Sequence, residues 1–115
     1  MYNFRTDLAS ERRDLYEKAN NLKNGIEGIE SQKEDVNEKI KIERVQILNE
    51  KGEKAIRKPI GTYVTIDVKD LKIATEEEME KAGEVLAKEL KNIVDKHVGS
   101  QDEVLVVGLG NIYVT

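Results

Sequence analysis

The stretch TEEEMEKAGEVLAKELKNIVDKHVG at residues 75–99, followed by VLVV at 104–107, decides the predicted fold. Thr75 and Glu78 have the spacing of a capping box, which marks the start of a helix. We therefore predict a long helix that begins after Thr75 and ends at Gly99, a residue that readily adopts the left-handed conformation. The apolar stripe of this helix is expected to consist of Met79, Ala82, Leu86, Leu90, Ile93 and Val94.

The sequence predicts a strand on either side of this helix. Residues 60–68, IGTYVTIDV, are rich in β-branched side chains, and residues 104–107 are fully apolar, as in a central strand that is covered on both faces. A strand, a helix and a central strand form half of an open α/β sheet, in which ligands bind beyond the carboxyl ends of the strands. The predicted fold class is therefore α/β, a partial open three-layer sheet with a helix packed on it.

The N-terminal third of the chain predicts less regular structure. A helix is expected from Ala9, with Ser10 as its candidate cap. Residues 20–39 are rich in Asn, Gly, Glu and Lys, and we expect them to be mostly loop with a short strand around Ile26 and Ile29.

The middle of the chain predicts one further strand. Residues 40–48, IKIERVQIL, alternate apolar and polar side chains twice, with a change of phase at Glu43–Arg44. We interpret this pattern as a half-buried strand with a bulge at the phase change. Residues 49–59 predict a turn and one helical turn that ends before Pro59, because the residue before a proline disfavours helix.

Composition argues against several classes of function. The 115 residues suffice for one small domain, and 19 basic and 23 acidic side chains give a net charge of −4 without a basic stripe for nucleic acid. No apolar run reaches the roughly 18 residues of a membrane span, and the N-terminus has no apolar signal segment. Cysteine is absent and His97 is the single histidine, so we expect no metal site. The low aromatic content, 4%, indicates that part of the core is supplied from elsewhere.

The first candidate site is the loop GLGN, which comprises Gly108, Leu109, Gly110 and Asn111. Its glycines would allow a ligand to approach the backbone. The loop lacks the third glycine of a dinucleotide fingerprint and the Lys-Ser/Thr of a phosphate-binding loop, so the alternative is a plain tight turn. The acidic runs are interpreted as solvated surface, His97 as a surface residue favoured by the helix dipole, and the serines lack His and Asp at a hydrolase spacing.

The second candidate site is the segment FRTDLASE at residues 4–11. An acidic residue followed by Leu-Ala in front of a helix looks like a protease recognition sequence, and exposed termini are where cleavage concentrates. The alternative is an ordinary lead-in to the helix, and the pattern alone leaves both interpretations open.

Three stretches together indicate a family. RTDLA at residues 5–9, KPIGTYVTID at 58–67 and VLVVGLGNIYVT at 104–115 resemble, in this order and approximate spacing, the spore germination proteases. The resemblance implies an α/β fold related to the hydrogenase maturation peptidases. It also implies an aspartic-type endopeptidase, made as a zymogen in the cytoplasm of the forespore and spore core. Such an enzyme forms homotetramers and degrades small acid-soluble spore proteins, with no cofactor and no direct contact with nucleic acid or membrane.

The resemblance also assigns sites to residues of this chain. It implies a propeptide at residues 1–7, cut between Asp7 and Leu8, and places the N-terminal part of the peptidase domain at 8–115. The catalytic aspartate of the family is expected as the second residue after Thr115, so no catalytic residue is expected within the chain. A carboxylate dyad needs both of its members, so we expect the 115-residue chain to be inactive.

Two other functions are compatible with the residues alone. One is a non-catalytic module that binds a partner protein through an exposed sheet edge and its acidic helices. The other is a small-ligand module that binds a phosphate at the GLGN loop, for which the incomplete glycine fingerprint is unfavourable.

Overall fold

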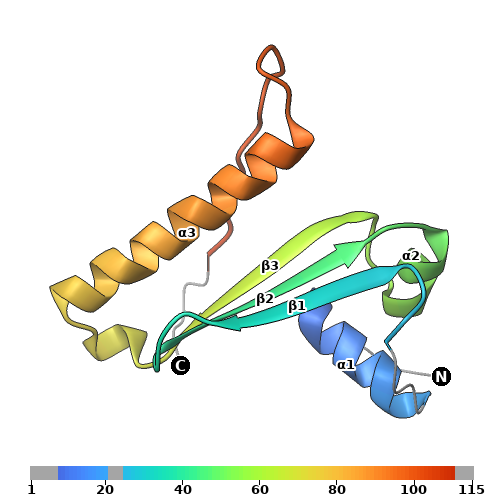
Figure 1. The fold of residues 1–115 in the computed structure, drawn as a ribbon, viewed down its shortest axis with the longest axis horizontal. Coiled ribbons are helices and arrows are strands. Elements are labelled where there is room, and N and C mark those ends of the chain that lie inside the picture. The colour runs from blue at the N-terminus through green and yellow to red at the C-terminus, as the bar shows by residue number, and fades with distance from the viewer. Residues whose placement is uncertain (1–7, 21–24, 111–115) are drawn as a thin grey trace.

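A computed structural model describes residues 8–20 and 25–110 of the chain. The sheet has the strand order β1-β2-β3, and both strand pairs are antiparallel. Helix α3 covers one face of the sheet, while α1 and α2 lie against the other face (Figure 1). The fold class, α/β with a partial open sheet and a helix packed on it, is confirmed. The elements are α1 (Ala9–Ala19), β1 (Ile29–Asp35), β2 (Ile40–Ile47), α2 (Glu50–Ile56), β3 (Gly61–Val68), the 3-10 turn η1 (Leu71–Ile73) and α3 (Glu76–His97).

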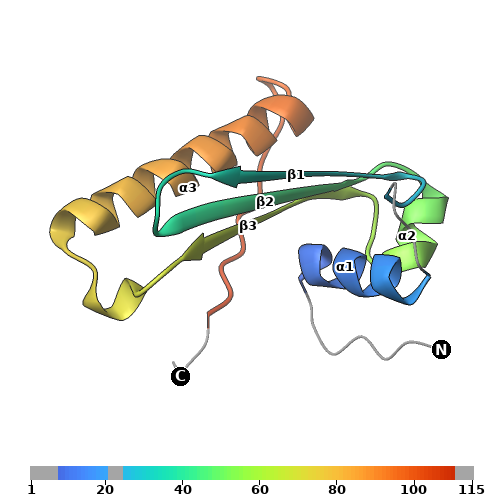
Figure 2. The ribbon, with the colours of Figure 1, turned by 60° about the horizontal axis from the view of Figure 1, so that its bottom comes forward.

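The central strand β2 explains why the molecule has helices on both faces. The predicted bulge at Glu43–Arg44 is wrong, because β2 pairs with both neighbours in an unbroken register. In a regular strand, the phase change of the sequence sends apolar side chains to opposite faces. Ile40 and Ile42 therefore face α3, whereas Val45 and Ile47 face α1 and α2. Figure 2 shows α3 on one side of the sheet and α1 and α2 on the other.

Two separate apolar clusters follow from this arrangement. The cluster on the α3 face forms near the start of β2, and partly buried side chains of β3 pack against it. The cluster on the opposite face forms near the end of β2 and joins β2 to α1 and α2. The buried members are Ile40, Ile42 and Val85 in the first cluster, and Ala9, Ile26, Val45, Ile47, Ala55 and Ile56 in the second.

Helix α1 begins where it was predicted but is not capped as predicted. Its N-cap is Leu8, no side chain caps it, and Ser10 is instead buried inside the first turn, so the prediction for Ser10 is wrong. Arg12 ties the helix to the end of α2, because its guanidinium donates to the carbonyl of Arg57 at 2.8 Å and to that of Ile56 at 3.4 Å. Burial of Ala9 and these two bonds fix the helix on the sheet.

Strand β1 corrects the prediction of a loop over residues 20–39. Seven residues from Ile29 to Asp35 pair with β2, and Ile26 is buried beside the core without belonging to a strand. All but Ile29 are exposed polar residues, because β1 is an edge strand held by backbone pairing rather than by a buried face. This composition explains why the alternation that identifies strands is missing here.

Helix α2 and strand β3 match their predictions closely. The side chain of Asn49 accepts hydrogen bonds from the backbone N–H groups of Lys51 and Gly52, which caps α2. The helix ends at Arg57 in the left-handed conformation, two residues before Pro59. Strand β3 covers Gly61–Val68, within the predicted range 60–68.

Helix α3 has the predicted start but not the predicted end or orientation. The capping box between Thr75 and Glu78 is present. The helix ends at Val98 in an extended conformation, so the prediction of a left-handed Gly99 is wrong. The predicted stripe is also wrong in part: Met79, Leu86, Leu90 and Val94 are exposed, and the buried residues of the helix are Val85 and Glu89.

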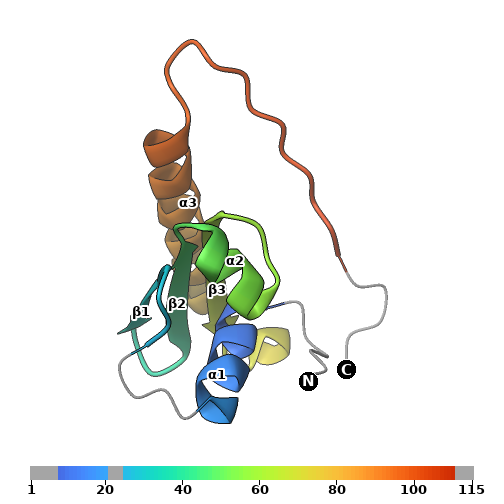
Figure 3. The same ribbon diagram turned by 90° about the vertical axis from the view of Figure 1, so that its right-hand side faces the viewer.

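Residues 104–107 form no strand in the structure. They are exposed and unpaired, so the described sheet has no parallel central strand. Figure 3 shows the segment that follows α3 running back on the β3 side of the sheet. An apolar run becomes a strand only where a neighbouring strand accepts its backbone hydrogen bonds. No helix among residues 8–20 and 25–110 is long and apolar enough to cross a membrane.

Candidate functional site

The predicted cleavage site lies directly in front of α1. Asp7 is outside the described residues, and Leu8 is exposed in an extended conformation as the N-cap of the helix. The next residue, Ala9, is buried in the core, and the carbonyl of Leu8 accepts the backbone N–H of Arg12 at 3.0 Å. The segment therefore changes from an exposed, extended chain to an anchored helix within a single residue.

The predicted loop at the end of the chain is open on all sides. Gly108, Leu109 and Gly110 are exposed and belong to no helix or strand, and Asn111 lies outside the described residues. A Cβ atom built on Gly108 or Gly110 would meet no atom within 4 Å. Leu109 is 93% exposed, and neither this loop nor Leu8 lines the cavity between the β1–β2 turn and α3.

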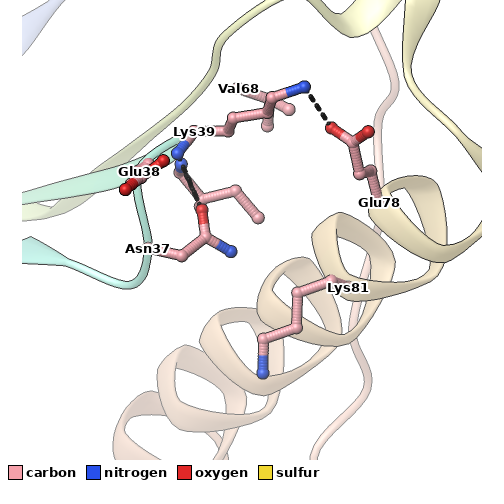
Figure 4. A pocket seen from close by; sticks show the side chains of 7 residues that line it. Asn37, Glu38, Lys39, Val68, Glu78 and Lys81 are labelled. Carbon is pink, nitrogen blue, oxygen red and sulfur yellow. Dashed lines mark hydrogen bonds and ion pairs between the residues drawn. The ribbon is translucent and has the colours of Figure 1, made fainter.

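A cavity of about 360 Å³ lies between the β1–β2 turn and the start of α3. Ile40 and Val68 form its apolar part, and Asn37 holds the turn by accepting the backbone N–H groups of Lys39 and Ile40. Figure 4 shows Lys39 reaching Glu78, at 2.6 Å between Nζ and Oε2. The cavity joins one end of the sheet to the capping box of α3.

The electrostatics of this cavity are those of a closed ion pair. Its hydrogen bond to Lys39 is the main cause that lowers the pKa of Glu78, and the bonds to Thr75 lower it further. The same pair raises the pKa of Lys39. Lys39 and Glu78 neutralise each other across the cavity, and we assign this pair a role in fastening α3 to the sheet.

A second ionic contact fastens the middle of α3. The guanidinium of Arg44 on β2 donates from Nε to Oε1 of Glu89 at 2.8 Å and also donates from Nη2 to this carboxylate. Its Nη1 reaches Glu34 of β1 at 3.1 Å. Glu89 is only 4% exposed, and its hydrogen bond is the main cause that raises the pKa of Arg44. A carboxylate buried this deeply requires such a partner.

The predicted absence of metal ligands and the role of His97 can be compared with the described residues. They contain no group of three or more His, Cys, Asp or Glu side chains that could hold a metal ion. His97 is exposed and shares a hydrogen bond of 2.9 Å with Thr62, while Ser10 is buried. His97 therefore has the Thr62 hydroxyl, and not Ser10, as its hydrogen-bond partner.

Two contacts on this surface were not anticipated from the sequence, namely Lys39–Glu78 and Arg44–Glu89. The sequence does carry a signal for the second contact. Glu89 follows Val85 by one helical turn and therefore lies on the same side of α3. Arg44 is in phase with Ile40 and Ile42 and therefore lies on the same face of β2. For Lys39, which lies in a turn, the sequence carries no corresponding signal.

Comparison with known proteins identifies the class to which this α/β scaffold belongs, that of the peptidases. A family model described as germination protease matches residues 6–115. The match includes the lead-in to α1, the whole sheet, α3 and the segment that follows it. The chain therefore belongs to the germination protease family.

Individual relatives agree with the family match. The chain is 43% identical over 115 residues to a protein named germination protease from Clostridium perfringens (strain SM101 / Type A), an alignment that covers 100% of this chain and 34% of the relative. Its identity to the germination protease of Clostridium acetobutylicum is 43% over 117 residues, covering 100% of this chain and 35% of the relative. The identity to the germination protease of Caldanaerobacter subterraneus is 44% over 113 residues, and this alignment covers 96% of this chain and 32% of the relative. The chain thus spans about a third of the length of these curated relatives. No solved structure gives a significant match.

Proposed function

We propose that this chain is the N-terminal part of an aspartic-type endopeptidase zymogen that acts in spore germination. The observation that carries the proposal is the alignment of the entire chain with about a third of proteins named germination protease. In this proposal the substrates are small acid-soluble spore proteins, the enzyme acts in the cytoplasm of the forespore and in the spore core, and it assembles as a homotetramer. No cofactor takes part.

The proposed activation step is hydrolysis of the bond between Asp7 and Leu8, which removes residues 1–7 as a propeptide and leaves 8–115 in the peptidase domain. The position of Leu8 supports this step, because its exposed, extended backbone has the conformation that a peptidase can bind. Ala9 is buried and starts α1, so a peptidase that binds residues on both sides of the bond must open the first helical turn. The anchoring of α1 by Arg12 would then limit the rate of cleavage.

The proposed catalytic aspartate lies beyond Thr115, beside the loop of Gly108, Leu109, Gly110 and Asn111. A peptidase of this type needs two carboxylates that share a proton, so that one activates water while the other protonates the substrate. Among the described residues, Glu78 and the buried Glu89 are each paired with a basic side chain. The 115-residue chain alone is therefore proposed to be inactive.

The experiment compares the 115-residue chain with the product of its reading frame extended past Thr115. Both proteins are incubated with a peptide of the sequence FRTDLASE, residues 4–11, and the products are identified by mass spectrometry. We expect the extended product to cleave the peptide after the aspartate and to acquire Leu8 as its own N-terminus. The 115-residue chain is expected to do neither.

Two variants sharpen this test in the extended product. Asp7→Asn is expected to slow the release of residues 1–7 by about tenfold or more, since a site built for a charged side chain rejects the analogue that lacks it. Asp14→Asn, which alters an exposed acid further along α1, is the matched control and should leave the rate unchanged. Absence of any cleavage by the extended product would overturn the peptidase proposal, and a stop codon after Thr115 would favour the partner-binding module.

A further inference from the structure

The cavity between the β1–β2 turn and α3 has an apolar floor. Two residues form this floor, the buried Ile40 at the start of β2 and Val68 at the end of β3. The cavity volume of about 360 Å³ lies within the range of small-molecule sites, roughly 300–1,000 Å³. Such sites combine an apolar lining with a few polar groups that orient the ligand. The floor therefore suits the apolar part of a small ligand.

Contacts within the chain hold the two walls of this cavity in place. Lys39 joins the β1–β2 turn to the first turn of α3 through its ion pair with Glu78. The side-chain oxygen of Asn37 accepts the backbone N–H groups of Lys39 and Ile40, which fixes the turn itself. Because both walls are fixed in advance, a ligand would not have to order them, and this preorganisation favours binding.

Three polar groups that line the cavity are left without a close partner among residues 8–20 and 25–110. Only the oxygen of the Asn37 amide is used by the turn, so its nitrogen still has two hydrogens to donate. Glu38 forms no ion pair with a described residue. Lys81 approaches Glu84 only to 3.9 Å, and its side chain is 52% exposed. The cavity thus offers one anion, one cation and one amide donor.

These three groups come from two different sides of the cavity. Asn37 and Glu38 belong to the β1–β2 turn, whereas Lys81 lies in the second turn of α3. Figure 4 shows Lys81 across the space from Asn37, whose amide nitrogen points toward α3. A ligand on the apolar floor would therefore meet polar groups of both charges at once.

We propose that this cavity binds a free α-amino acid with a branched apolar side chain, such as leucine. The side chain of the ligand lies on Ile40 and Val68, and its ammonium group faces Glu38. Its carboxylate accepts hydrogen bonds from Lys81 and from the Asn37 amide. A carboxylic acid without the ammonium group would leave Glu38 unmatched, and an amine without the carboxylate would leave Lys81 unmatched. The inference does not depend on the proposed peptidase activity.

An NMR titration of the isotope-labelled chain with L-leucine tests this proposal. We expect saturable shifts in the amide signals of residues 37–40 and of the first two turns of α3, with a Kd of about 1 mM or lower. N-acetyl-L-leucine lacks the ammonium group and L-leucine amide lacks the carboxylate. Each should bind at least about tenfold more weakly than leucine, because a hydrogen bond to a charged group contributes about this factor. Glycine, which lacks the side chain, should also bind more weakly.

Two variants assign each charge of the ligand to its partner. Lys81→Met should weaken the binding of leucine about tenfold but leave that of leucine amide unchanged, because the amide has no carboxylate to lose. Glu38→Gln should weaken the binding of leucine but leave that of N-acetyl-leucine unchanged, because this ligand has no ammonium group.

The matched control is Lys88→Met, the same substitution two helical turns further along α3. Lys88 lines a neighbouring cavity but not this one, so the affinity for leucine should stay the same. All three substituted side chains are exposed, so the variants should keep the fold, which the amide signals outside the cavity verify. The proposal would be overturned by a failure of leucine to bind, by equal affinities for leucine and either derivative, or by shifts confined to other elements.

Discussion

At the scale of single residues, charged side chains connect α3 to the sheet. Lys39 holds the first turn of the helix through Glu78, and Arg44 holds its middle through Glu89. Both contacts join residues that are far apart in the chain, so each restrains the position of the helix rather than its formation. The capping box between Thr75 and Glu78, in contrast, acts within one turn and stabilises the helix itself.

The Lys39–Glu78 pair makes a prediction about pH. Because the pKa of Glu78 lies below its usual range in the folded state, the stabilisation is complete above the ordinary pKa of a glutamate and is lost as the pH falls through the folded pKa. Lys39→Met should raise the pKa of Glu78 toward the usual range without fully restoring it, because the hydrogen bonds to Thr75 remain. NMR titration of the Glu78 carboxyl group measures this shift.

The control for this prediction is Lys91→Met. Lys91 pairs with Asp95 at 2.7 Å near the other end of α3, so its loss should leave the pKa of Glu78 unchanged. A Lys39→Met chain in which Glu78 titrates as it does in the unmodified protein would show that the ion pair does not form in solution.

At the scale of elements, close approach of backbone determines which glycines can change. Gly52 in α2 packs against Gly28, and a Cβ atom on Gly52 would lie 2.6 Å from the carbonyl oxygen of Gly28. Gly28 itself has a positive φ of 84°, which favours glycine. Gly83 in α3 is exposed, and a Cβ atom there would meet nothing within 4 Å.

The two helical glycines therefore predict opposite effects of the same substitution. Gly83→Ala should raise the free energy of unfolding by about 0.5–1 kcal/mol, because alanine is the better helix former. Gly52→Ala should lower it by about 1–3 kcal/mol, because the backbone of β1 and the preceding turn must move to admit the methyl group. Urea denaturation of both variants checks the signs, and a stabilised Gly52→Ala chain would contradict the packing described here.

At the scale of the whole molecule, two small clusters on opposite faces of the sheet hold different elements. Val85 is the buried apolar residue through which α3 joins its cluster, and Glu89 is its other buried residue. The cluster on the other face holds α1, α2 and the end of β2. We expect that α3 can detach from the sheet while the other face stays folded.

Glu89→Ala tests this division of the molecule. Removing the buried carboxylate should lower the free energy of unfolding by about 2–3 kcal/mol, less than for a fully buried pair because Arg44 keeps Glu34 as a partner. Hydrogen exchange should accelerate in α3 and remain slow in α2 and in the second half of β2. Glu84→Ala, at a side chain 72% exposed on the same helix, should change stability by no more than about 0.5 kcal/mol. If hydrogen exchange accelerated equally in all elements of the Glu89→Ala chain, the idea that the two faces of the sheet unfold independently would be contradicted.

The sequence by itself determined the features that depend on neighbouring residues. The capping box at Thr75, the start of α1 at Ala9, the end of α2 before Pro59 and strand β3 all follow from local backbone preferences. The family was also evident from three motifs, and the match over residues 6–115 confirms it.

Only the tertiary structure decided which surfaces are buried. Strand β1 exists because β2 accepts its backbone hydrogen bonds, although its own side chains show no strand pattern. The change of phase in β2 reflects helices on both faces of the sheet rather than a bulge. The predicted apolar stripe of α3 is largely exposed, and Val85 and Glu89 are the residues buried against the sheet. The physical reason is the same in each case: backbone preferences act between residues adjacent in the chain, whereas burial depends on partners that are distant in the chain and near only in space.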